Sequence, residues 1–397
     1  MLKMLSACTY ELDNPLKAIH DIDTQLDLSN KLLKNSAAFL FCHSKYIETR
    51  AMEVICNSLP LGIVGCTSMY MGAAPAGRQE AGEFMLTVTV LTSDEIAFSA
   101  GLSEPLSGKN AADAVAALYR ETAAPLGGTA DLAFAFPPTM LDVPVDIFCE
   151  SLDKAAGKTP VFGSVALDMD EHIRRPQTLY HGLYSGRAAA YSDRMPLLLI
   201  KGPVKPRFFS IRFPDKPVLS QNVVITEAEG PRLISINNKS AADFLMEVGI
   251  LHKDFRNFTQ AMPLIIEYKH KPEPEVVVIQ NINTDGTLIC GKHVMAGGTV
   301  NIGAISREYA LESARTLIQE IKKNEKSSGV LIASCFLRSL ALGGSSEEEV
   351  KLIQQELSGF PAPYLYINSG GELCPRYAEN GETVNQALQY ALVACQL

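Results

Sequence analysis

The sequence predicts an α/β protein made of two similar halves, each a mixed β-sheet assembly covered by helices. The chain has 397 residues, more than one hydrophobic core usually serves, so two domains are expected. Short apolar strand patterns alternate with segments of helical periodicity, as in α/β folds. The same order of elements occurs twice, about half a chain apart, which indicates an internal duplication. We place the division beside Arg194, giving domains at 1–195 and 196–397.

The first half carries the order strand, helix, strand, helix, strand. An apolar run at 95–101 predicts the first strand, and residues 110–122 have apolar side chains at helical spacing. The remaining elements are a strand at 132–136, a helix at 145–155 and a strand at 160–167.

The second half repeats this order. A strand at 298–304 leads into a helix at 307–323, whose apolar residues fall on one stripe. A strand at 329–337, a helix at 347–357 and a strand at 363–369 follow. Ser346 and Glu349 have the spacing of a capping box at the start of the last helix.

Two antiparallel hairpins are expected in addition, which makes the sheets mixed. One joins residues 84–91 to 96–101. The other has an Asp285-Gly286 turn between two apolar runs, a strong hairpin signal.

Composition and charge exclude several classes of function. Hydrophobic residues make up 47% and charged residues 20%, as in a folded protein. The net charge of −9 disfavours nucleic acid and anionic membranes as partners. The N-terminus lacks the apolar core of a secretion signal and no long apolar span follows, so we expect a cytoplasmic protein with no membrane partner.

The cysteines predict neither disulfides nor a metal site. There are nine, scattered and mostly within apolar runs, which is typical of small buried side chains in a reducing compartment. No CxxC pair is present, and Cys290 with His293 stands alone, whereas a structural zinc site needs four clustered ligands. We therefore expect no metal and no cofactor.

The first candidate site is the turn of Gly65, Cys66, Thr67 and Ser68, at the end of an apolar run. Backbone amides freed at a strand end bind a carboxylate, and the hydroxyls would complete the site. The alternative is a tight turn with a buried thiol.

The second candidate joins two strand ends that the repeat makes equivalent. Gly163, Ser164 and Asp168 follow one strand. Asn368, Ser369 and Glu372 follow its counterpart, and the two acidic residues would bind an ammonium group. Each of these residues is alternatively a turn or capping residue.

The third candidate is Arg187, which follows His181 in a strand-like segment. A guanidinium binds a carboxylate through two parallel hydrogen bonds. The alternative is a solvated or structural ion pair.

The order of these motifs resembles the FIST family, in which an N-terminal FIST domain precedes a C-terminal one. The residues that carry the resemblance are Asp13, Asn14, Pro15 and Ala18, the strand at 37–44, the turn at 65–68, and the segments 162–168, 241–245 and 364–373. The resemblance implies a stand-alone sensory module of intracellular signal transduction. Its ligand would be small, with amino acids as the suggested class, and a signalling protein would be its partner.

The sequence departs from the family pattern at two places. Met69, Tyr70 and Met71 put bulky side chains after the first turn, before Gly72. The terminal motif also differs, since Gly370 and Gly371 precede Glu372. Both departures allow a ligand that differs from the family's norm.

Two other functions are compatible with the sequence. Cys66 would serve as the nucleophile of a hydrolase or transferase if His43 or His181 lay within hydrogen-bond reach as its base. Alternatively, the protein binds no ligand and presents a surface to a signalling partner. The oligomeric state is not predicted.

Overall fold

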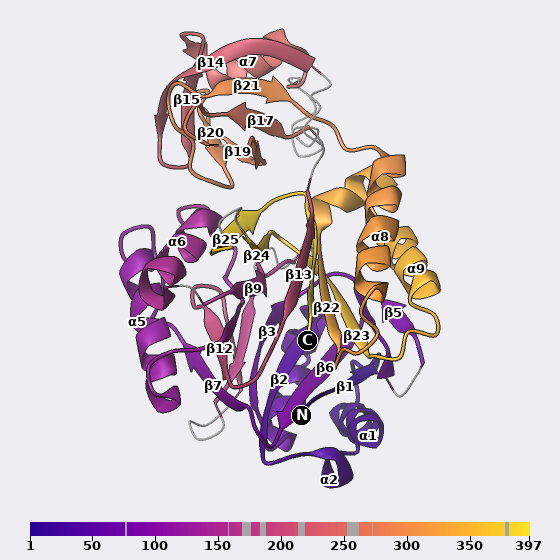
Figure 1. Cartoon of the computed structure of the whole chain (residues 1–397). Coiled ribbons are helices and arrows are strands. Elements are labelled where there is room, and N and C mark those ends of the chain that lie inside the picture. Colours follow the sequence, from indigo (N-terminus) through magenta and orange to yellow (C-terminus); the bar gives the residue numbers. More distant parts are fainter. Residues whose placement is uncertain are drawn as a thin grey trace.

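The computed structural model describes residues 1–75, 78–157, 159–168, 176–182, 188–212, 219–251, 262–271, 273–377 and 381–397. These residues form a large body and a smaller lobe (Figure 1). The lobe is inserted into the sequence of the body, because the chain leaves the body after β13 (Arg207–Ile211) and returns at α8 (Arg307–Lys322).

The described part of the body contains three six-stranded sheets. The first has the order β1 (Leu2–Thr9), β6 (Leu86–Ser93), β2 (Asn35–Cys42), β3 (Gly62–Thr67), β10 (Thr178–His181), β11 (Ala189–Tyr191). The second has the order β7 (Ala97–Leu102), β12 (Pro196–Lys201), β8 (Leu132–Ala135), β9 (Val161–Ser164), β24 (Glu372–Tyr377), β25 (Thr383–Leu388). The third has the order β13, β26 (Leu392–Gln396), β22 (Val330–Cys335), β23 (Tyr364–Ser369), β4 (Met71–Ala73), β5 (Glu80–Gly82).

The three sheets share one plan. Each has a central parallel pair, β2 with β3, β8 with β9 and β22 with β23. An antiparallel hairpin contributed by another part of the chain extends each pair: β10–β11 adds to β3, β24–β25 to β9 and β4–β5 to β23. The body is therefore built from three equivalent units that exchange hairpins with one another.

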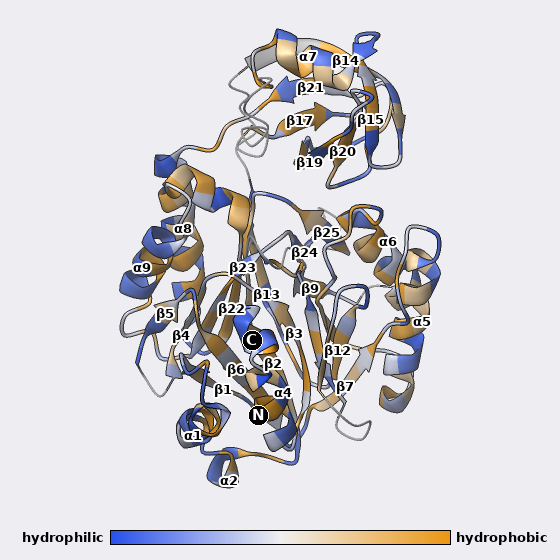
Figure 2. Cartoon of the chain, turned by 180° about the vertical axis from the view of Figure 1, so that it is seen from behind, coloured by the Kyte–Doolittle hydropathy of each residue, from blue (hydrophilic) through white to orange (hydrophobic). Residues whose placement is uncertain are grey.

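Helices cover the outer faces of the sheets, and the inner faces pack on one another. The shared interior includes Phe39 from the first sheet, Phe134 from the second and Val393 from the third. The parallel strands are buried on both faces, which explains why they appear in the sequence as nearly continuous apolar runs. Figure 2 shows the outer surfaces of the covering helices largely hydrophilic, as amphipathic helices require.

The helices of the body follow the strands in the same repeated order. The first unit contains α1 (Pro15–Leu26), α2 (Leu28–Lys31), α3 (Lys45–Glu48) and α4 (Ala51–Ser58); the second contains α5 (Ala111–Ala123) and α6 (Val145–Ala156); the third contains α8 and α9 (Glu347–Glu356). Two 3₁₀ segments lie at Ala124–Leu126 and Phe336–Leu342. Side-chain caps fix two of the starts: Asn14 accepts the Lys17 amide of α1, and Ser306 accepts the Tyr309 amide of α8.

The lobe has its own sheet and its own hydrophobic core. Its strand path is β18 (Glu275–Val277), β17 (Leu264–Glu267), β21 (Thr299–Ile302), β14 (Leu219–Glu229), β15 (Arg232–Ile236), β20 (Leu288–Cys290), β19 (Ile279–Ile282), with β16 (Lys239–Ser240) paired to β15. Helix α7 (Ala241–Glu247) covers this sheet, and Ile236, Leu245 and Leu264 are among its fully buried core residues.

The predicted α/β class with mixed, helix-covered sheets is confirmed. The order predicted for two halves occurs a third time at the N-terminus, as β1, α1, β2, α4 and β3. The predicted strand at 298–304 corresponds to β21, which belongs to the lobe, and β13 holds the equivalent place in the third unit.

The two predicted hairpins have different outcomes. The hairpin around Asp285-Gly286 is confirmed, since β19 pairs with β20 across this turn. The hairpin of 84–91 with 96–101 is wrong, because β6 and β7 belong to different sheets: β6 pairs with β1 and β2, and β7 pairs with β12. The division of the chain at residue 195 stays a prediction.

Among the described residues, no helix combines the length and the apolar character needed to span a membrane.

Candidate functional site

The strand-end turns predicted from the sequence meet in the interior of the body. Gly65, Cys66 and Thr67, which were predicted to form a turn, are instead the last residues of β3. Gly163 and Ser164 end β9, and Asn368 and Ser369 end β23; β3, β9 and β23 are each the second strand of a parallel pair. The Ser68 hydroxyl donates to the Asn368 carbonyl at 3.0 Å, and the Leu167 amide donates to the Thr67 carbonyl at 3.0 Å. The second candidate is joined in the same way, because Glu372 lies opposite Ser164 in the pairing of β24 with β9.

These turns are closed to solvent. The relative exposure is 0% for Cys66, 1% for Ser68, 1% for Ser164 and 0% for Glu372. The other buried members are Thr67, Asp168, Asn368 and Ser369. The structure therefore brings these residues together as part of the core, and their contact with a ligand stays a prediction. Arg187 lies outside the described residues.

Gly65 and Gly163 serve a packing role. A Cβ atom at Gly65 would lie 1.8 Å from the Leu40 carbonyl oxygen, and one at Gly163 would lie 1.9 Å from that of Ala135. Both contacts are with backbone of the neighbouring parallel strand, so no side chain can relieve them.

Cys66 lacks the environment of a nucleophile. Burial raises the pKa of its thiol, and the thiol donates toward the Ser164 carbonyl at 3.9 Å. His181 lies opposite Ile63, three residues from Cys66 and about 10 Å along the strand. The His43 ring packs against Phe84, with its Nδ1 accepting the Lys45 amide. A neutral buried thiol is a poor nucleophile, so the geometry does not support the hydrolase or transferase alternative.

Glu372 is a buried acid whose two carboxyl oxygens accept no hydrogen bond of normal geometry from the described residues, although the Ala391 amide, the Ser369 hydroxyl and the Cys335 thiol lie close enough to favour its charged form. The neighbouring Ser369 hydroxyl donates to the Gly371 carbonyl instead. Burial holds the pKa of Glu372 well above its usual range, although the nearby charge of Arg338 acts in the opposite direction. Burial therefore favours the protonated form of Glu372 in the folded protein.

We expect Glu372→Gln to stabilise the protein increasingly as pH rises above 5. The unfolded glutamate loses its proton near its ordinary pKa while the folded one keeps it, so the folded state binds more protons and stability falls with rising pH. For each unit by which the pH rises, the free energy of unfolding of the wild type falls by up to about 1.4 kcal/mol, and that of the glutamine variant does not fall in this way.

Urea unfolding at pH 5, 6, 7 and 8 measures this difference. Glu121→Gln, an exposed position on α5, is the matched control and should show no such trend. A stability difference that stays constant across this range would contradict the account.

A buried ion pair beside these turns was not predicted from the sequence. Arg338 contacts the Glu349 carboxylate through Nε at 3.0 Å and Nη2 at 2.6 Å, with both side chains 1% exposed. The second Glu349 oxygen accepts from Ser334 at 2.5 Å and from Tyr366 at 3.0 Å. The predicted capping box is wrong, because Ser346 makes no side-chain cap and Glu349 points into the core.

One open site among the described residues is a cleft of about 260 Å³ between the lobe and the body. From the body it is lined by α6 and by strands β24 and β25, and from the lobe by Lys271 and the segments at 273–276 and 292–293. Backbone and apolar contacts between the described residues help to hold the two parts together around it. Gln389 accepts the Val278 amide at 2.9 Å, the Val145 amide donates to the Gly291 carbonyl at 3.2 Å, and Tyr390 packs in a cluster with Val278.

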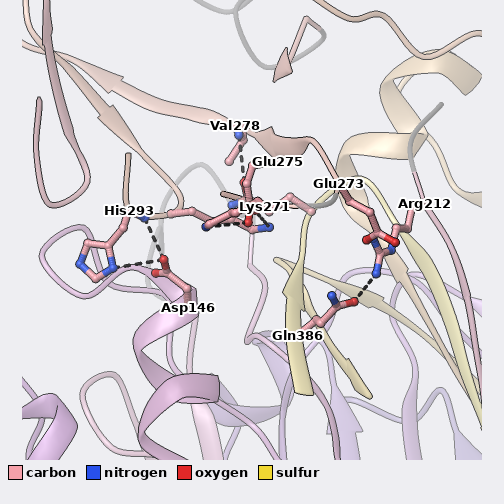
Figure 3. A network of polar contacts seen from close by, with 10 residues as sticks. Asp146, Arg212, Lys271, Glu273, Glu275, Val278, His293 and Gln386 are labelled. Atoms are coloured by element: carbon pink, nitrogen blue, oxygen red, sulfur yellow. Dashed lines mark hydrogen bonds and ion pairs between the residues drawn. The ribbon is translucent and has the colours of Figure 1, made fainter. Parts of the chain in front are cut away.

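One end of the cleft, the arginine end, consists of Arg212, Glu273, Arg376 and Gln386. Arg212 pairs with the Glu273 carboxylate and donates to Gln386 (Figure 3). Arg376 approaches the other oxygen of Glu273 at 3.9 Å, and its buried Nε has no hydrogen-bond partner among the described residues. A carboxylate from the lobe thus sits between two guanidinium groups of the body.

The middle of the cleft holds a compact charge cluster. Glu275 accepts from Lys271 at 3.0 Å and from Lys292 at 3.1 Å. Burial opposes ionisation of Glu275, but the two lysines outweigh it and lower its pKa to about 2. This carboxylate is therefore ionised at any physiological pH.

The opposite end, the histidine end, consists of Asp146, Glu150 and His293. Asp146 and Glu150 lie one turn apart on α6, and His293 comes from the lobe. The Asp146 carboxylate accepts the backbone amide of His293 at 3.0 Å and contacts its ring Nδ1 at 3.1 Å (Figure 3). The hydrogen bond to Asp146 raises the pKa of His293.

The family models match most of the chain. The FIST N domain matches residues 36–239, and the FIST C domain matches residues 241–375. The chain belongs to the FIST family. FIST domains are associated with sensory roles in signal transduction. The two FIST matches meet inside the lobe, between β16 and α7, so each contributes both to the lobe and to the body.

The other comparisons add little to this assignment. None of the curated proteins matches this FIST chain. Among solved structures it is similar to the crystal structure of cyanuric acid hydrolase from A. caulinodans, with 9% identity and a TM-score of 0.39 over 100% of this chain and 98% of that one. A likeness this weak supports no statement about activity.

Proposed function

We propose that this FIST protein is a sensor whose small ligand, an amino acid or a similar metabolite, binds in the cleft between lobe and body. The observation that carries the proposal is the arginine end. There Glu273 already presents a carboxylate to Arg212 and Arg376, and the buried Arg376 Nε still has donor capacity. Pairs of guanidinium groups are well suited to binding a carboxylate.

The remaining groups of the arginine end complement the other half of an amino acid. A ligand carboxylate that takes the place of Glu273 leaves the Glu273 side chain available to accept from the ligand's ammonium group. The Gln386 amide offers both a donor and an acceptor beside it. A cavity of about 260 Å³ suits a small metabolite, since drug-sized ligands occupy about 300 to 1,000 Å³.

Ligand binding in this cleft would change the contact between the lobe and the body, and this change would be the signal. Glu273 belongs to the lobe, whereas Arg212 and Arg376 belong to the body. A ligand that replaces the Glu273 contact changes how the lobe is held, and a signalling protein partner in the cytoplasm would respond to that change.

A thermal-shift screen of the purified protein against the twenty amino acids and related metabolites tests the proposal. A true ligand at a hundredfold excess over its Kd adds about 2.7 kcal/mol of stability, which is readily measured. Absence of any shift would overturn the sensor proposal and favour a ligand-free interaction protein.

A further inference from the structure

We propose that the histidine end is a divalent transition-metal site in which Asp146, Glu150 and His293 bind an ion of the Zn²⁺ type and join the lobe to the body. This inference does not depend on the proposed function, because it uses none of the residues of the arginine end. A metal site was not expected from the sequence, since its ligands come from two distant segments of the chain.

The three side chains converge to within coordination reach. One donor atom from each lies within 4.8 Å of the other two. Ligands at about 2.0 to 2.1 Å from a tetrahedral zinc ion are about 3.3 Å apart. The Asp146 Oδ2 and His293 Nδ1 atoms, at 3.1 Å, already have this spacing. Only Glu150, an exposed side chain at the mouth of the cleft, has to rotate inward.

The site has carboxylate oxygens that are not used in other contacts and could coordinate an ion. Asp146 Oδ1 is shielded from solvent and has no hydrogen-bond partner among the described residues. Glu150 has no hydrogen bond or ion pair within the described ranges of the chain. An imidazole with two carboxylates favours zinc and related transition metals, whereas calcium and magnesium prefer oxygen ligands alone. A tetrahedral ion held by these three side chains would have a fourth position for water or a ligand.

The surroundings hold the ligands in place and limit repulsion. The backbone amide of His293 donates to Asp146, which fixes both residues before an ion arrives. The nearest positive charges, Lys271 and Lys292, are both paired with Glu275. This cluster of two lysines and one glutamate keeps one net positive charge. Asp146 and Glu150 supply two negative charges at the site, so the attraction of a cation to them exceeds this repulsion.

A metal ion at this position would cross-link α6 of the body to the lobe. At this end of the cleft the existing link is a pair of contacts to one Asp146 oxygen, in addition to the Val145–Gly291 hydrogen bond, and coordination would replace the contact with the His293 ring by metal–ligand bonds. Metal binding would therefore stabilise the docked lobe.

The test is calorimetric titration of the tag-free full chain with Zn²⁺ after treatment with a chelator. We expect one ion per chain, and Co²⁺ as a replacement should give the visible absorption of a four-coordinate site. Glu150→Gln and His293→Gln should each weaken binding by at least about tenfold. Glu150 is the decisive position, because its exposed side chain supports no other contact and the variant should fold.

Two controls complete the experiment. Glu121→Gln removes an exposed carboxylate from α5, and Arg376→Gln alters the arginine end; both should bind Zn²⁺ as wild type does. The proposal is overturned if neither ion binds stoichiometrically, or if Glu150→Gln and His293→Gln bind with unchanged affinity. Neither result would affect binding of an amino acid at the arginine end.

Discussion

Arg338→Met is expected to destabilise the protein by about 3 to 5 kcal/mol. The substitution leaves the Glu349 carboxylate buried, 1% exposed, without the guanidinium that neutralises it. It also removes the hydrogen bonds from Arg338 Nη2 to the Ala310 carbonyl and the Ser313 hydroxyl, at 2.8 and 2.7 Å. Equilibrium unfolding in urea measures the loss.

The double variant Arg338→Met with Glu349→Leu is the informative companion. Replacing both charges with apolar side chains removes the uncompensated charge, so most of the lost stability should return. A double variant as unstable as Arg338→Met would show that the hydrogen bonds around the pair, rather than its charges, account for the effect.

Gly65→Ala is expected to destabilise the protein by about 3 kcal/mol, the upper end of the cost of overpacking. The added methyl group would lie 1.8 Å from the Leu40 carbonyl oxygen, a backbone atom of β2 in the central parallel pair. Gly163→Ala should have a comparable effect, because its methyl group meets the Ala135 carbonyl oxygen at 1.9 Å.

Gly62→Ala on the same strand is the matched control. Its nearest neighbours would be the Ala100 Cβ and the His181 carbonyl oxygen, both at 3.9 Å, an ordinary contact distance. The change should be neutral or slightly stabilising, because alanine has less conformational freedom to lose than glycine. Equal thermal stability of the Gly62 and Gly65 variants would contradict the packing argument.

Sequence periodicity predicted the core elements of two of the three units. Strands such as β8 and β22 are buried on both faces, so their apolar runs were visible, and α5 and α8 carry clear apolar stripes. The unit without a predicted element order is the N-terminal one, from β1 to β3. In the unit that ends with β23, the first strand was assigned wrongly, because the lobe separates β13 from α8. The strand pattern that directly precedes α8 in the sequence is that of β21, which belongs to the lobe, so local periodicity does not identify β13 as the first strand of the unit.

The exchange of hairpins could not be predicted from local patterns. Residues 84–91 and 96–101 have the spacing of a hairpin, but β6 pairs with β2 in one sheet and β7 pairs with β12 in another. Pairing between strands far apart in sequence depends on tertiary packing, which propensity does not encode.

The strand-end turns were recognised from the sequence, but their burial was not. The repeat related the strand ends at 163–168 and 368–372, and Glu372 does lie opposite Ser164. The contact of Ser68 with Asn368, 300 residues away, was not predicted. Turn residues are usually exposed, yet these lie where the inner ends of three sheets meet. The cleft was missed for a different reason, since Arg212, Glu273 and Arg376 share no motif and meet only because the lobe docks on the body.

Equilibrium binding of the most stabilising amino acid from the screen, measured by calorimetry, tests the central claim most directly. Wild type is compared with Arg376→Gln, with Cys66→Ala and with Arg120→Gln, an exposed control on α5. Loss of a charged hydrogen-bond donor costs about 1.5 to 3 kcal/mol, so Arg376→Gln should weaken binding by at least about tenfold. Cys66→Ala and Arg120→Gln should bind as wild type does. Binding that is lost in Cys66→Ala and unchanged in Arg376→Gln would place the ligand at the strand-end turns and contradict the cleft.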